Sequence, residues 1–127
     1  MHDKHLYEYA VIRYVPRVER EEFINVGLIM MCKRRRWLRV ELWIDERKMA
    51  VHDCELTPDE LAGQLRAFTL IGEGRSEGGS IASLEAEERF RWLTAVKSAC
   101  VQTSRPHPGI TDNLDATFAR LMEELVK

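Results

Sequence analysis

The sequence contains no long hydrophobic run. None of its apolar stretches approaches the roughly 20 residues that a membrane-spanning helix needs. The opening residues, MHDKHLYEYA, carry charges but no apolar core of a secretory signal, so we expect no signal peptide. The three cysteines, Cys32, Cys54 and Cys100, are odd in number and far apart, which suits neither a disulfide framework nor a C-x-x-C motif. These absences favour a reducing cytoplasmic setting.

The chain also has little net charge. Its formal charge of -2 gives no overall attraction to nucleic acid or to an anionic membrane, so binding of either needs a local patch. His2, His5 and His52 have no metal-ligand spacing, and we expect neither a metal nor another cofactor. A length of 127 residues with 45% hydrophobic residues is typical of one globular domain, residues 1–127.

Three apolar runs in the first third of the chain predict strands. They cover residues 7–15, 23–32 and 37–44, and their short connections favour an antiparallel meander. Pro16 ends the first run, because it offers no N–H group to a ladder. The basic sequence KRRR, residues 33–36, predicts a turn between the other two. Alternation in the second run predicts one unbroken core face, formed by Ile24, Val26, Leu28, Met30 and Cys32.

The rest of the chain is predicted to be mostly helical. Asp45 is a candidate cap of a short helix, and Thr57 followed by Pro58 is a strong start signal for a longer one. Apolar residues at helical spacing predict two further helices. The four predicted helices cover about residues 45–51, 57–72, 83–96 and 112–125.

Two short segments lie before the last predicted helix. Residues 99–104 are a candidate fourth strand, whereas RPHPG, residues 105–109, is predicted to be irregular because of its two prolines and one glycine. Strands followed by helices predict the α+β class. We therefore expect a three-stranded antiparallel meander whose apolar face is covered by three or more helices.

Four segments carry a resemblance to a known family: YAVIRYVP, EEFINVG, RFRWLTA and QTSRPHPG. Together they resemble the bacterial domain-of-unknown-function family numbered 3037, along nearly the whole chain. The resemblance implies a small cytoplasmic bacterial protein and supplies no catalytic residues. Family members are often encoded beside HipA-like serine/threonine kinases, so it also implies a protein partner, with such a kinase as a candidate.

Polar residues inside the predicted strands are the first candidates for a ligand site. A buried Arg13 needs an acceptor, and a protein carboxylate or backbone carbonyl is favoured over an anionic ligand. Gly27 would allow a ligand to approach closely, and Asn25 would present its amide to it. A β-bulge, or room for an aromatic ring, is the favoured alternative for these two residues.

The segment QTSRPHPG supplies further candidates, because binding residues often lie in irregular stretches. Ser104 and His107 are near in sequence, which does not make a nucleophile–base pair. Arg89 lies on a predicted helix and adds a guanidinium. The candidate ligand-binding residues are Arg13, Asn25, Gly27, Arg89, Gln102, Ser104 and His107.

The three tryptophans are candidates for a protein interface. Trp37 and Trp43 alternate with the apolar face of the third strand, and Trp92 lies three residues from Arg89 on a helix. Their alternative is to lie under a helix or to complete the core.

Three hypotheses of function follow. The leading one is a non-enzymatic protein-interaction module, with a HipA-like kinase as a candidate partner. The second is nucleic-acid binding through residues 33–36, for which a solvated hairpin turn is the favoured alternative. The third is a small-ligand or enzymatic site, formed by Arg13, Asn25, Arg89, Gln102 and His107. An open sheet edge is also compatible with a homodimer.

Overall fold

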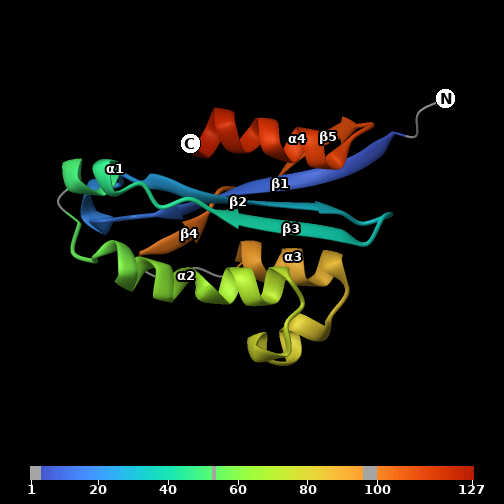
Figure 1. The fold of residues 1–127 in the computed structure, drawn as a ribbon, viewed down its shortest axis with the longest axis horizontal. Helices are drawn as coiled ribbons and strands as arrows, with labels where there is room; N and C mark the ends of the chain where they lie inside the picture. Colours follow the sequence, from blue (N-terminus) through green and yellow to red (C-terminus); the bar gives the residue numbers. More distant parts are fainter. Residues whose placement is uncertain (1–3, 53, 96–99) are drawn as a thin grey trace.

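A five-stranded antiparallel sheet forms the centre of the fold (Figure 1). The computed structural model describes residues 4–52, 54–95 and 100–127. The strands run in the order β3-β2-β1-β4, and β5 also pairs with β1. The strands are β1 (His5–Tyr14), β2 (Ile24–Cys32), β3 (Trp37–Leu42), β4 (Val101–Thr103) and β5 (His107–Thr111). The predicted meander is confirmed, and β4 lies within the predicted fourth strand, whose residue 99 is outside the described residues.

The prediction that residues 105–109 are irregular is confirmed for Arg105 and Pro106 but is wrong for residues 107–109, which belong to β5. β5 pairs with the first half of β1, where Pro108 lies opposite Glu8 and Gly109 opposite Tyr7. The proline is tolerated because β5 is an edge strand, so no further strand needs the N–H group that proline lacks. The glycine is required because a Cβ atom at Gly109 would lie 2.3 Å from the ring of Tyr7.

Helices follow the sheet as predicted, and their start signals are present. Asp45 accepts hydrogen bonds from the first turn of α1, and Thr57 forms a reciprocal capping box with Glu60. Asn113 caps the last helix by accepting from the N–H of Ala116. The predicted extension of α3 to residue 96 lies outside the described residues. The helices are α1 (Glu46–Val51), α2 (Pro58–Gly72), α3 (Ala86–Ala95) and α4 (Leu114–Leu121), which continues as the π-helical turn η4 (Met122–Val126). The shorter 3-10 turns are η1 (Val18–Arg20), η2 (Ser76–Gly78) and η3 (Ser80–Ser83).

Both faces of the sheet carry helices, where the sequence had predicted one covered face. α2 and α3 pack on one face, and α4 with η4 packs on the other (Figure 1). The larger core lies under α2 and α3 and includes Ile12, Tyr14 and Phe90. The smaller core lies under α4 and includes Val11 and Phe118. The α+β class is confirmed.

The predicted unbroken core face of β2 is wrong, because the register shifts within the strand. Gly27 lies opposite Ile12, but Asn25 lies opposite Arg13, so Val26 is the extra residue of a β-bulge. One inserted residue reverses the alternation of side chains. As a result Val26 faces the larger core, whereas Leu28 faces the smaller one.

Candidate functional site

Three of the predicted ligand residues lie side by side on the sheet. Arg13 of β1 is directly opposite Asn25 of β2 and directly opposite Gln102 of β4. Its neighbours in the strand, Ile12 and Tyr14, face the core under α2 and α3. Because strand side chains alternate, Arg13 and its two partners lie on the face that carries α4. Together with Phe23 we call these residues the Arg13 cluster.

Among the described residues the guanidinium of Arg13 has no anionic partner. Its central carbon lies 4.1 Å from the centroid of the Phe23 ring, which is 45% exposed. Its Nε atom is buried without a hydrogen-bond partner, and the side chain forms no ion pair with the described residues. A half-buried guanidinium normally has an acceptor, because an unpaired donor in a desolvated position is costly. The predicted protein acceptor of Arg13 is therefore not seen among the described residues.

Asn25 connects the cluster to the end of the last helix. Its Nδ2 atom donates to the carbonyl oxygen of Leu125 at 2.8 Å, while its Oδ1 atom is buried without a partner. Lys48 of α1 donates to the neighbouring carbonyl of Val126 at 2.9 Å. These bonds satisfy carbonyls that the end of a helix leaves unpaired. Asn25 therefore fixes η4 beside Arg13 and keeps one acceptor oxygen free.

The bulge explains the glycine that follows Asn25. A Cβ atom at Gly27 would lie 2.8 Å from the backbone oxygen of Glu41 and 2.9 Å from a methyl group of Leu42. Gly27 therefore allows β2 and β3 to approach closely. Its position in this structure permits the pairing of β2 with β3.

Ser104 and His107 lie further along the same sheet edge. The Ser104 hydroxyl accepts from the N–H of Val11 at 2.9 Å, and the N–H of Ser104 donates to the Val11 carbonyl at 2.8 Å. Ser104 thus continues the pairing with β1 between β4 and β5. His107 is exposed and lies opposite Tyr9, with ring centroids 5.3 Å apart. Both contacts are structural, and neither residue contacts the Arg13 cluster through a described hydrogen bond.

Arg89 lies on the other side of the sheet. Its Nη1 atom donates to the carbonyls of Ile71 and Gly72 at 2.8 and 3.0 Å, and its Nε atom donates to that of Leu84 at 3.0 Å. These bonds cap the end of α2 and join it to α3. The five residues predicted to form one ligand or enzymatic site therefore do not converge, because only Arg13, Asn25 and Gln102 are neighbours.

The structural role of Arg89 can be tested by stability. Arg89→Met keeps the aliphatic stem but removes the three hydrogen bonds, so we expect the free energy of unfolding to fall by about 1–2 kcal/mol. Urea unfolding, monitored by circular dichroism, measures this change in the free energy of unfolding. Arg66→Met on the exposed face of α2 is the control and should change stability by less than about 0.5 kcal/mol. Equal stability of both variants would contradict the capping role.

The three predicted interface tryptophans have different environments. Trp37 is half-buried under α4, where its ring packs edge-on against Phe118 with centroids 6.3 Å apart. This environment agrees with the alternative prediction that Trp37 lies under a helix. Trp43 and Trp92 are 44% and 42% exposed, and the ammonium of Lys127 lies 4.9 Å from the Trp43 ring. Trp43 is near the Arg13 cluster, since its N–H donates to the carbonyl of Val26, the residue after Asn25.

A bidentate ion pair lies on the face of β1 opposite to Arg13. Arg91 of α3 donates to both carboxylate oxygens of Glu8, and these hydrogen bonds lower the pKa of Glu8 below its ordinary value. Glu8 contributes to the lining of an apolar cavity of about 270 Å³ beside Leu6 and Met31. This carboxylate is therefore neutralised by Arg91 and is not an acceptor for Arg13. In the described ranges no group of His, Cys, Asp and Glu side chains is arranged to hold a metal ion.

A family model covers almost the entire fold. It matches residues 9–126, from the middle of β1 to the end of η4, and describes a protein of unknown function, DUF3037. The chain belongs to this family. Membership in DUF3037 assigns no activity, so a functional argument depends on the geometry of the chain. No curated protein and no solved structure matches significantly. Within the described ranges no helix is long and apolar enough to cross a membrane.

Sequence reasoning missed Phe23 as a member of the cluster. Its signal was its position at the start of the second apolar run, on the same side as Asn25 by alternation. An exposed aromatic residue next to a strand arginine is a recognisable pattern for cation–π stacking. The pairing of Arg13 with Gln102 had no local signal, because the two residues are far apart in the chain.

Proposed function

We propose that this DUF3037 protein is a non-catalytic protein-interaction module that binds an acidic group of its partner at the Arg13 cluster. The observation that carries the proposal is the guanidinium of Arg13, whose central carbon lies 4.1 Å from the Phe23 ring centroid and which has no acceptor among the described residues. Two amide side chains, Asn25 and Gln102, lie on either side of it. A carboxylate would complete this arrangement.

The chemistry of the cluster favours a carboxylate. Arginine binds a carboxylate through two parallel N–H···O bonds, and stacking on an aromatic ring holds its plane in one orientation. The amide of Gln102 offers further donors to the same anion, because it carries both N–H groups and a carbonyl.

The surface around the cluster favours a protein as the source of that carboxylate. Exposed Phe23 contacts the half-buried Arg13, and exposed Trp43 lies on the other side of β2. Aromatic residues and arginine are enriched in protein interfaces. Lys48 adds positive charge near the end of η4, whereas the ammonium of Lys127 is paired with Glu123 and Glu41. A partner with an acidic side chain beside an apolar one would therefore fit this surface.

The family resemblance suggests a HipA-like kinase as the first partner to test. A tagged protein is purified from its native host, and the recovered partner is then titrated against the purified variants. Arg13→Gln should weaken binding at least about tenfold, which corresponds to ~1.4 kcal/mol, because the carboxylate would lose its bidentate N–H donor.

The matched control is Arg66→Gln, which removes the same charge from α2 on the other side of the sheet. Its affinity should remain within about twofold of the unchanged protein. Equal binding by both variants, or purification of the protein without any partner, would contradict the proposal. Thermal unfolding of each variant verifies that the loss of binding is not a loss of folding.

A further inference from the structure

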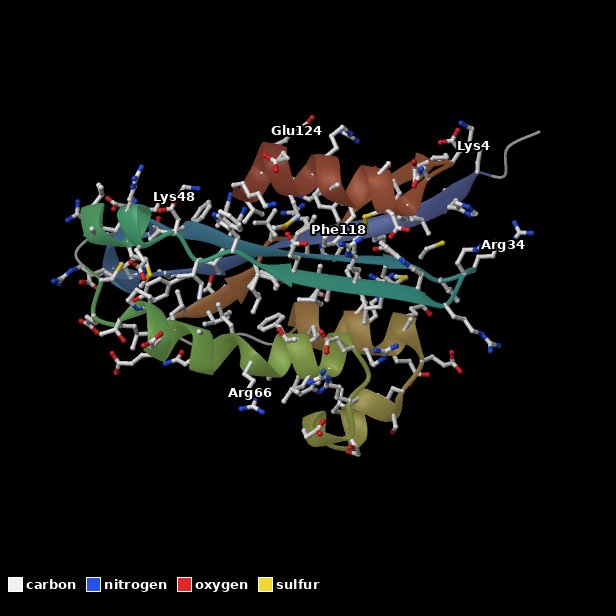
Figure 2. All side chains as sticks on the ribbon, viewed as in Figure 1. Lys4, Arg34, Lys48, Arg66, Phe118 and Glu124 are labelled. Atoms are coloured by element: carbon white, nitrogen blue, oxygen red, sulfur yellow. The ribbon has the colours of Figure 1, made fainter. Side chains whose placement is uncertain are left out.

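A basic cavity lies at the end of the sheet opposite to the Arg13 cluster. It has a volume of about 290 Å³ and is lined by Lys4, His5, Arg34 and Arg35. His5 begins β1 and Lys4 precedes it, whereas Arg34 and Arg35 belong to the turn between β2 and β3. Figure 2 shows Lys4 and Arg34 at one end of the molecule and Lys48 at the other. The cavity is thus separate from the surface assigned to the partner.

The sheet register brings these four residues together. Glu8 lies opposite Met31 in the outermost pair of β1 and β2, so the residues before Glu8 and the turn after β2 lie at the same end of the sheet, where all four side chains line the cavity. The basic turn alone was better explained as a solvated turn. The structure changes that interpretation, because Lys4 and His5 add two more nitrogen-bearing side chains to the same cavity.

No carboxylate of the described residues neutralises the charges of the cavity. Within the turn, Lys33 pairs with Glu87 at 3.4 Å and Arg36 pairs with Glu85 at 3.9 Å, both toward α3. The side chains that line the cavity form no ion pair with the part of the chain that the structure describes. Two residues of the turn are therefore paired with carboxylates, and the other two, Arg34 and Arg35, remain available to an anion.

We infer that this cavity binds a chain of linked phosphates, either free or as the end of a nucleotide. Such a chain carries on the order of four negative charges when it contains three phosphates. Two guanidiniums and one ammonium, with His5 beside them, supply a comparable number of donors and positive charges. The volume is close to the lower limit of about 300 Å³ for small-molecule sites, which suits a phosphate chain better than a whole nucleotide.

The test measures binding of inorganic tripolyphosphate by isothermal titration calorimetry, with ATP and a single-stranded oligonucleotide as the other ligands. We expect one tripolyphosphate per chain, and affinity that falls as salt is raised because these charges are partly exposed. The Arg34→Gln/Arg35→Gln variant should bind at least about tenfold more weakly. The control is Arg47→Gln/Arg66→Gln, which removes two charges elsewhere and should stay within about twofold.

The ATP arm distinguishes the two sources of the phosphate chain. Equal affinity for tripolyphosphate and ATP would indicate that only the phosphates are recognised, and tighter binding of ATP would indicate a nucleotide. Absence of tripolyphosphate binding, or equal loss in the cavity and control variants, would overturn the inference. Binding of the oligonucleotide alone would overturn it too, in favour of a nucleic-acid backbone as the ligand. None of these results depends on the partner proposed for Arg13.

Discussion

Replacement of Phe118 by alanine is expected to lower the free energy of unfolding by about 3–5 kcal/mol. Phe118 is fully buried and is the largest side chain that α4 places in the smaller core. Figure 2 shows it between α4 and the sheet. Its ring contacts the edge of Trp37, and the guanidinium carbon of Arg39 lies 4.6 Å from its centroid. The substitution therefore leaves a cavity in the smaller core and removes the contacts of the ring with Trp37 and Arg39.

Urea unfolding, monitored by circular dichroism and by tryptophan fluorescence, measures this loss. The control is Arg120→Ala, two residues further along α4, whose side chain is exposed and pairs with Glu124. It should change stability by less than about 0.5 kcal/mol. A loss below about 1 kcal/mol for Phe118→Ala would show that α4 is not held by this ring.

The same substitution has a consequence for the Arg13 cluster. η4 reaches Asn25 only as the continuation of α4, and the bond from Asn25 to the Leu125 carbonyl depends on that position. Loosening of α4 would free the Asn25 amide. Phe118→Ala should therefore also weaken partner binding, whereas Arg120→Ala should not.

The sequence predicted the meander because its signals are local. Alternation, Pro16 and the KRRR turn each act within a few residues, and the caps at Asp45 and Thr57 act in the same way. The face of the sheet to which each β2 side chain points could not be predicted from such local signals. The bulge at Val26 depends on how β1 pairs with β2, and one extra residue transfers Leu28 from the larger core to the smaller one.

The pairing of β5 with β1 at the edge of the sheet also could not be predicted from the sequence. β5 contains Pro108 and Gly109, which are turn signals in isolation, yet the edge position tolerates the proline and the Tyr7 ring requires the glycine. Trp37 had no signal that α4 would cover it, because the second face of the sheet had no predicted helix. Tertiary contacts decided each of these positions.

The candidate site was predicted residue by residue but not as a group. Arg13 and Asn25 are close in the chain, and their pairing follows from the meander. Gln102 reaches Arg13 only because β4 returns to the other side of β1 after the helices. Arg89 carried the same kind of functional signal as Arg13, but its guanidinium is used to cap α2. Residue type alone does not separate these two arginines.

A second large effect is expected at the bulge. Gly27→Ala should lower the free energy of unfolding by about 3 kcal/mol, the upper part of the range for overpacking. The added Cβ atom would lie 2.8 Å from the backbone oxygen of Glu41 and 2.9 Å from the Leu42 side chain. The leucine can rotate, but the oxygen belongs to the neighbouring strand and can move only with it. β2 and β3 must therefore separate.

The control is the same substitution at Gly63, which lies inside α2 with open space around the position of an added Cβ atom. There alanine should raise stability by about 0.5–1 kcal/mol, because glycine is a poor helix former. Two identical changes would thus have opposite signs in the same urea experiment. Destabilisation by both, or by neither, would contradict the close approach of β2 and β3 at the bulge. Because Asn25 lies beside the bulge, Gly27→Ala should also weaken partner binding, whereas Gly63→Ala should leave it unchanged.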